Sequence, residues 1–93
     1  MEKIKKMIAK ILTSYGFKTD GTGVYELFNS ERSRLIAVSC DDRICFELWN
    51  VNGSQVRLGT FYYSMFDEKF FKIGVKIAEF KTNINCYVNF LNA

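Results

Sequence analysis

Three cysteines are the residues of this sequence best suited to covalent or metal chemistry, and no histidine accompanies them. A cysteine nucleophile is usually activated by a nearby histidine, so Cys40, Cys45 and Cys86 have no ordinary activating partner. Cys40 and Cys45 are separated by four residues, but a structural zinc site needs four ligands and only Cys86 remains. The sequence therefore predicts three buried structural thiols, no metal site and no cofactor.

Two other patterns resemble catalytic or nucleotide-binding motifs only in part. Asp41 and Asp42 are adjacent carboxylates, but they stand between two short expected strands, where aspartate is typical of a turn. Gly21 and Gly23 lack the later glycine and the strand-to-helix context of a dinucleotide-binding loop. We therefore expect no catalytic residues and a protein that is not an enzyme.

Length and composition predict one small domain that covers residues 1–93. Of the 93 residues 48% are hydrophobic, including nine Phe, five Tyr and one Trp, and such bulky rings help a short chain to bury a core. The odd, scattered cysteines favour reduced thiols, and Lys10 interrupts the apolar part of any signal peptide. No segment is long enough to span a membrane. These features predict a cytoplasmic protein with no membrane partner.

Hydrophobic periodicity predicts an α+β fold that begins with a helix over residues 2–15. Gly16 follows the last apolar position and suits a left-handed helix stop. After a turn at residues 19–23 the period changes to two, and the short gaps between the apolar runs can join only antiparallel neighbours. The result is a four-stranded antiparallel meander of Val24–Phe28, Arg34–Cys40, Arg43–Asn50 and Gln55–Tyr63.

A second helix and a C-terminal strand are expected after the meander. Residues 64–67 resemble a helix-capping box, although Gly74 makes a strand the alternative for the segment that follows. In residues 83–91 apolar residues alternate with asparagine, which is unfavourable inside a helix, so a fifth strand is predicted there, with helix as the alternative. The expected order is α-β-β-β-β-α-β, with the helices on one face of the sheet. The apolar face of the second helix would consist of Phe66, Phe70, Ile73, Ile77 and Phe80.

The alternation within the third hairpin predicts which side chains face away from the helices. The apolar positions of its two strands share a face if Asn52–Ser54 forms a three-residue turn with Gly53 left-handed. This register places Trp49 opposite Arg57, so that the guanidinium stacks on the indole. The predicted core then contains Ile44, Phe46, Leu48, Leu58 and Tyr62. The predicted outer surface carries Trp49, Arg57, Glu47, Phe61, Tyr63 and, from the first strand, Tyr25.

This outer surface is predicted to bind another protein. Antiparallel sheets normally leave the face away from the core polar, whereas Trp, Tyr and Arg concentrate binding energy at protein interfaces. A domain of this kind would act by binding alone, as an inhibitor, an immunity protein, a phage or mobile-element antagonist, or an adaptor. The alternatives are that the C-terminal segment buries these rings as ordinary core, or that two copies form a homodimer through them.

Lysines on the two expected helices suggest nucleic acid as an alternative partner. A helix, an antiparallel sheet and a second helix is also the order of double-stranded RNA-binding domains, an analogy at the level of the fold alone. The net charge of +3 is mild for a nucleic-acid binder, and a solvated helix face explains the same lysines more simply. The residues of this alternative site are Lys3, Lys6, Lys10, Lys69, Lys72 and Lys76.

Overall fold

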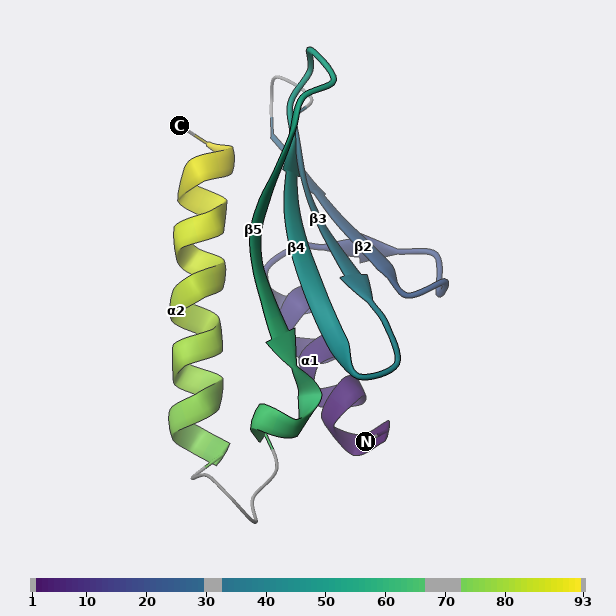
Figure 1. Ribbon diagram of the computed structural model, residues 1–93, viewed down its shortest axis with the longest axis vertical. Helices are drawn as coiled ribbons and strands as arrows, with labels where there is room; N and C mark the ends of the chain where they lie inside the picture. The colour runs from purple at the N-terminus through teal and green to yellow at the C-terminus, as the bar shows by residue number, and fades with distance from the viewer. Residues whose placement is uncertain (1, 30–32, 67–72, 93) are drawn as a thin grey trace.

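The computed structural model describes residues 2–29, 33–66 and 73–92, and it contains an N-terminal helix, a five-stranded antiparallel sheet and a long C-terminal helix (Figure 1). Residues of both helices pack with the same side of the sheet in one hydrophobic core. The α+β class is confirmed, and so is the placement of the helices on one face. Within the described ranges, no helix is long and apolar enough to cross a membrane.

Helix α1 (Glu2–Ser14) forms where the apolar spacing predicts it and ends at a glycine. Gly16 has a φ of +95°, its amide donates to the carbonyl of Thr13 at 3.0 Å, and the amide of Phe17 donates to that of Leu12 at 3.1 Å. This left-handed stop turns the chain so that Phe17 enters the core. The buried residues of the helix itself are Ile8, Ile11 and Leu12.

The strands follow one another across the sheet in the order of the sequence, all antiparallel. They are β1 (Lys18–Thr19), β2 (Val24–Phe28), β3 (Arg34–Ser39), β4 (Arg43–Trp49) and β5 (Gln55–Tyr62). The four predicted strands agree with β2 to β5 to within one residue at each end. β1 lies partly within the predicted turn at residues 19–23, and its two residues pair with the middle of β2.

A bulge divides the hairpin of β4 and β5 into two parts of different register. The pairs on the turn side are Trp49–Gln55, Leu48–Val56 and Glu47–Arg57; the pairs beyond the bulge are Phe46–Gly59, Cys45–Thr60 and Ile44–Phe61. Leu58 is therefore the extra residue in β5. Because side chains alternate along a strand, one inserted residue moves every later side chain of β5 to the opposite face from that expected in the unbulged register.

Phe46 lies at the centre of the core, between the sheet and the C-terminal helix α2 (Ile73–Leu91). Its ring centroid is 5.9 Å from that of Phe61, 5.9 Å from that of Phe80 and 5.3 Å from that of Tyr87. Phe80 continues the cluster, with its centroid 5.6 Å from that of Phe66 in the 3₁₀ turn η1 (Tyr63–Phe66). Rings from β4, β5, η1 and α2 thus hold the second helix on the sheet.

The predicted fifth strand at residues 83–91 is wrong, because this segment is the second half of α2. Ile84, Tyr87 and Leu91 recur at helical spacing and are all buried against the sheet. The polar side chains nearby are accommodated within the helix: the Thr82 hydroxyl donates to the carbonyl of Ala78, and the Asn83 amide donates to that of Glu79, each at 2.9 Å. Burial of one apolar face therefore outweighs the weak helix propensity of asparagine.

The predicted start of the second helix agrees with the structure only in part. The first residues of the capping-box segment form η1, with Phe66 buried, while Asp67, Phe70 and the rest of residues 67–72 lie outside the described residues. From Ile73 onward the chain is helical, as predicted, and Phe80 is buried as expected of the apolar face.

Buried phenols predict a loss of stability at alkaline pH. Burial raises the pKa of Tyr63 and that of Tyr87 above the value of about 10 that tyrosine has in an unfolded chain. A raised pKa in the folded state means that this stabilisation is complete below about pH 10 and is lost as the pH rises through the folded value. We expect the free energy of unfolding, measured with urea between about pH 8 and pH 11, to fall at the upper end, and to fall less steeply in Tyr87→Phe.

The matched control for this experiment is Tyr62→Phe, because the ring of Tyr62 is 43% exposed. It should keep the decline of the wild-type chain. Equal slopes in Tyr87→Phe and in the wild type would show that the buried phenol contributes nothing to the alkaline loss.

Candidate functional site

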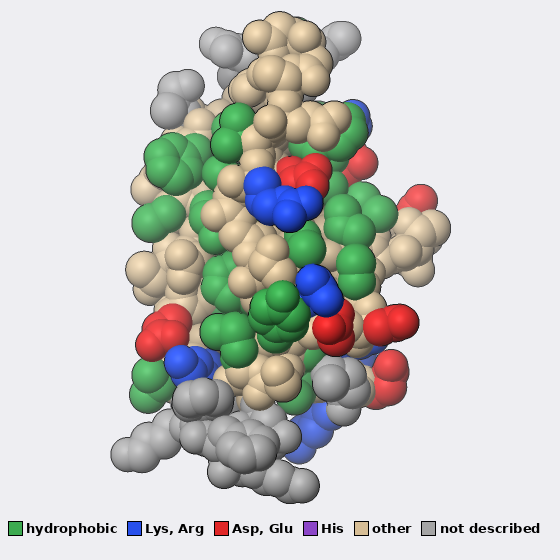
Figure 2. Space-filling view, in the orientation of Figure 1, with side chains coloured by type: hydrophobic (Ala, Val, Ile, Leu, Met, Phe, Trp, Pro, Cys, Tyr) green, Lys and Arg blue, Asp and Glu red, His purple; other side chains and the backbone are tan. Residues whose placement is uncertain are grey.

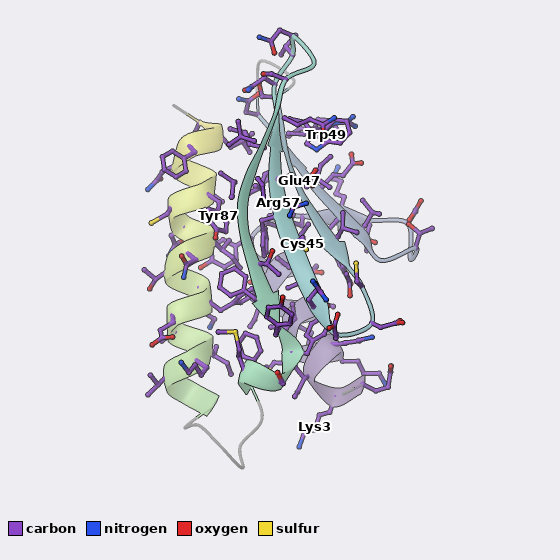
Figure 3. The ribbon with its side chains drawn as sticks, in the orientation of Figure 1. Lys3, Cys45, Glu47, Trp49, Arg57 and Tyr87 are labelled. Atoms are coloured by element: carbon purple, nitrogen blue, oxygen red, sulfur yellow. The ribbon has the colours of Figure 1, made fainter. Side chains whose placement is uncertain are left out.

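The sheet face turned away from both helices, called the outer face below, carries an ordered array of side chains. The strand pairing aligns these side chains in rows across the sheet. The row nearest the turn between β4 and β5 is Phe28, Arg34, Trp49 and Gln55; the next is Lys18, Glu26, Ile36, Glu47 and Arg57; the third is Val24, Val38, Cys45 and Thr60. In Figure 3, Trp49 and Glu47 extend from the sheet on the side away from α2, whereas Tyr87 lies between α2 and the sheet.

Trp49 is held in place by two charged side chains on this face. Its indole Nε1 donates a 3.0 Å hydrogen bond to the Glu47 carboxylate, and the Arg34 guanidinium lies 5.0 Å from the ring centroid in a cation–π contact. Arg34 in turn lies 3.7 Å from the carboxylate of Glu26. We call Glu26, Phe28, Arg34, Glu47 and Trp49 the Trp49 cluster; its indole is half-buried although no described helix covers it.

Ile36 shows how closely the outer face is packed. It lies between Glu26 and Glu47 in its row, on the side away from the helices, yet it is only 6% exposed. Neighbouring side chains of the same face must therefore cover it. Around this apolar centre acidic, basic and aromatic groups alternate, and Figure 2 likewise shows hydrophobic, basic and acidic side chains interspersed over the strands. The outer face is thus neither an ordinary solvated polar face nor a second hydrophobic core.

The structure confirms the outward placement of three of the six predicted surface residues, with different partners. Trp49, Glu47 and Arg57 lie on the outer face, but Trp49 is paired with Gln55, and the guanidinium on its ring belongs to Arg34. Arg34, Glu26 and Phe28 were not predicted. The alternation of Arg34–Ser39 does not single out an outer face, because Leu35 and Ile36 are both apolar and both buried.

The other three predicted surface residues lie on the core side, so the prediction is wrong for them. Phe61 is beyond the bulge, which reverses its face, and its ring contacts that of Phe46. Tyr63 is not in β5: it begins η1, is 1% exposed and shares a hydrogen bond with the Ser39 hydroxyl. Tyr25 pairs with Ala37, whose side chain is in the core.

The same bulge places Tyr62, which was predicted to lie in the core, on the outer face. Its ring lies 4.8 Å below the guanidinium of Arg43 at the end of the face far from Trp49. Asp42 accepts a hydrogen bond from Arg43 at 2.9 Å, which lowers the pKa of the carboxyl. Asp41 and Asp42 are exposed turn residues, as predicted. The remaining predicted core residues pack there: Ile44 and Phe46 are buried, and Leu48 and Leu58 contact the core cluster.

A shallow, open hollow of about 260 Å³ adjoins the Trp49 cluster at the β1–β2 edge. It is lined by Lys18, Thr19, Asp20, Val24, Glu26 and Phe28. Two of these residues, Glu26 and Phe28, also belong to the Trp49 cluster. The Asp20 carboxylate accepts hydrogen bonds from the hydroxyl and the amide of Thr22, which lower its pKa, so this rim stays negatively charged. The hollow extends the cluster into a larger polar and apolar surface.

The lysines of the alternative nucleic-acid site are only partly brought together. Lys3, Lys6 and Lys10 are exposed and recur along one side of α1. Lys76 lies on α2, where it is 3.4 Å from Glu79, and Lys69 and Lys72 lie outside the described residues. In Figure 3, Lys3 and Trp49 lie at opposite ends of the molecule. The two candidate surfaces are therefore separate.

Cysteine and acidic side chains do not gather at any one point of the described structure. Cys40, Cys45 and Cys86 are all free thiols, and Cys45 accepts a contact from the Thr60 hydroxyl at 3.6 Å. The predicted burial is wrong for Cys40 and Cys86, which are exposed, and Cys45 is only partly buried. Among residues 2–29, 33–66 and 73–92, no group of three or more Cys, Asp or Glu residues is placed to hold a metal ion. The arrangement that the described residues do build is a binding surface centred on Trp49.

Comparison with known proteins found no matching family, no matching curated protein and no matching solved structure.

Proposed function

We propose that this chain is a non-catalytic protein-binding domain whose docking surface is the Trp49 cluster. The observation that carries the proposal is that an indole on the uncovered face of the sheet is fixed by Arg34 on its ring and by Glu47 at its Nε1. Trp and Arg are the residue types most enriched at the energetic centres of protein interfaces. The cluster places both at one point.

The contacts within the Trp49 cluster favour binding because they order the surface before a partner arrives. Immobilising a side chain at an interface costs about 0.5–1.5 kcal/mol. The indole is already held by a hydrogen bond, and Arg34 is already held by Glu26 and by the ring. A partner that stacks on Trp49 therefore meets a fixed target. The charges at its rim, of both signs, would select a partner with complementary charges.

Proteins that act by binding alone include inhibitors, immunity proteins, phage or mobile-element antagonists and adaptors, and we place this chain among them. The three free thiols support a reducing compartment such as the cytoplasm as its place of action. A homodimer through the outer face is the form this proposal takes if the partner is a second copy of the chain.

The test uses the purified chain as bait in an extract of its source organism, with enriched proteins quantified by mass spectrometry. Trp49→Ala should lose the partner, because a hot-spot aromatic contributes about 2 kcal/mol or more, equivalent to about a 30-fold weaker dissociation constant. Val56→Ala is the matched control. Val56 lies on the same hairpin and is 50% exposed, but its side chain and that of its strand partner Leu48 are on the face opposite the Trp49 cluster. Far-UV circular dichroism should show both variants folded.

The sequence has a single tryptophan, so its fluorescence reports directly on the cluster. Adding the identified partner to the wild-type chain should shift the emission to shorter wavelength, because the half-exposed indole loses water. A partner that binds Trp49→Ala as tightly as wild type would refute the proposal.

Nucleic-acid binding through α1 is the second candidate function, favoured by the exposed row of Lys3, Lys6 and Lys10. A duplex RNA probe would then bind at low salt and dissociate as salt is added, since neutralised phosphates release counterions. Changing the three lysines to glutamine would abolish this binding, while Trp49→Ala would leave it unchanged. The same triple variant serves as a second control in the extract experiment.

A further inference from the structure

Three described arginines lie on the outer face, and one of them differs from the other two in its contacts. Arg34 and Arg43 each lie over an aromatic ring and pair with a carboxylate. The guanidinium of Arg57 takes part in no ion pair, hydrogen bond or ring contact with residues 2–29, 33–66 and 73–92. Its side chain is exposed, so the donors of this guanidinium are available to another molecule.

The carboxylate directly opposite Arg57 is used by a different group. Arg57 pairs with Glu47 across the hairpin, a position from which two side chains of opposite charge reach each other easily. Glu47 instead accepts the 3.0 Å hydrogen bond from Nε1 of Trp49. Figure 3 shows Arg57 and Glu47 close to each other and near Trp49. The carboxylate that fixes the indole is therefore not paired with the guanidinium.

A protein that docks on the Trp49 cluster would also cover Arg57. A standard interface buries about 800 Å² on each partner, which corresponds to a disc with a radius of roughly 16 Å. Glu47 is two residues from Trp49 along β4, and Arg57 is on the neighbouring strand, so the Cα atoms of Arg57 and Trp49 are about 8 Å apart. A guanidinium that loses its water without gaining an acceptor destabilises a complex. A partner that docks here must therefore supply an acceptor to Arg57.

The charges around Arg57 favour a single acidic group over a chain of phosphates. Glu26 and Glu47 lie in the same row of the outer face, where they would repel a polyanion. One carboxylate, in contrast, accepts two parallel hydrogen bonds from a guanidinium. Building on the function proposed above, we propose that Arg57 selects the protein partner by pairing with an Asp or Glu side chain. The partner would place this side chain beside the group that contacts Trp49.

A phage-displayed library of random dodecapeptides, panned on the immobilised wild-type chain, tests this pairing. Enriched peptides that no longer bind Trp49→Ala should contain Asp or Glu. Their dissociation constants should rise about 10-fold or more in Arg57→Gln, because a hydrogen-bonded charge pair is lost, and further in Arg57→Glu. Arg57 makes no side-chain contact among the described residues, so these variants should fold as the wild type does.

The matched control is Lys18→Gln, which removes the same charge from the same row. Lys18 is exposed and lies on β1, at the other side of the sheet from Arg57. It should leave the affinity of the peptides unchanged. Equal losses in Arg57→Gln and Lys18→Gln would overturn the proposal, because the peptides would then respond to positive charge in general.

The remaining outcomes separate this inference from the proposed function on which it rests. Acidic peptides that lose affinity in Arg57→Gln and keep it in Lys18→Gln would support the pairing. Peptides that depend on Trp49 but bind Arg57→Gln as tightly as wild type would overturn the pairing and leave the docking surface in place. The absence of any enriched peptide would also overturn the pairing, while the extract experiment would still decide whether the Trp49 cluster binds a protein.

Discussion

Replacing Phe46 with alanine should lower the free energy of unfolding by about 3–5 kcal/mol. The ring is fully buried, and its centroid lies within 6 Å of three others, one from β5 and two from α2. Truncation would leave a cavity at the junction of sheet and helix, and the surrounding rings are too rigid to fill it. Urea unfolding followed by circular dichroism measures the loss.

Small domains have total stabilities of about 5–15 kcal/mol, so Phe46→Ala can unfold a large fraction of the chain. Phe46→Leu keeps most of the volume and should cost less than about 2 kcal/mol, which allows a measurement in the folded state. Phe28→Ala is the matched control, because its ring is 54% exposed and should change stability by less than about 1 kcal/mol. Comparable losses for Phe46→Ala and Phe28→Ala would contradict the central role of Phe46.

The parts of the fold that follow from local sequence patterns could be predicted, and those that depend on one inserted residue could not. The apolar spacing of α1, the left-handed Gly16 and the short turns of the meander gave elements whose ends match the structure to within one residue. The bulge at Leu58 has one local signal, the neighbouring Gly59, because a glycine inside a strand often marks a bulge, but the glycine alone does not specify which residue is inserted. Trp49, Glu47 and Arg57 precede it in the hairpin and were placed on the correct face, whereas Phe61 follows it and was not.

The helical tail shows a second limit of sequence patterns. Alternation and helical spacing both fit residues 83–91, and asparagine propensity favoured a strand. Packing against the sheet decides in favour of the helix. Gly59 has no side chain, so the inner face of the sheet leaves room there for Tyr87 of α2. That space exists only because the bulge turns Gly59 toward the helix. The bulge therefore determines both the outer face and the packing of α2.

This dependence of α2 on Gly59 can be tested with a pair of substitutions. A Cβ added at Gly59 would overlap the Tyr87 hydroxyl, whereas the next ring atom, Cζ, would lie at an ordinary 3.4 Å. We expect Gly59→Ala to lower the free energy of unfolding by about 1–3 kcal/mol, because the overlap forces the tyrosine out of its packed position. In a Tyr87→Phe background the obstructing oxygen is absent, and the same alanine should be neutral or stabilising by up to about 1 kcal/mol, because alanine has less backbone entropy to lose than glycine.

The double-mutant cycle of Gly59→Ala and Tyr87→Phe isolates this contact from the separate effects of each change. A coupling of about 1–3 kcal/mol between residues that are distant in sequence would show that α2 packs directly over the bulged strand. The matched control is Gly53→Ala, where no atom lies within 4 Å of the added Cβ and the positive φ of +88° is the source of the cost. Its effect should be the same in both backgrounds. Additive effects of Gly59→Ala and Tyr87→Phe would mean that the Tyr87 hydroxyl does not contact β5 at Gly59. The bulge and the glycine would then not explain why residues 83–91 pack on the sheet as a helix.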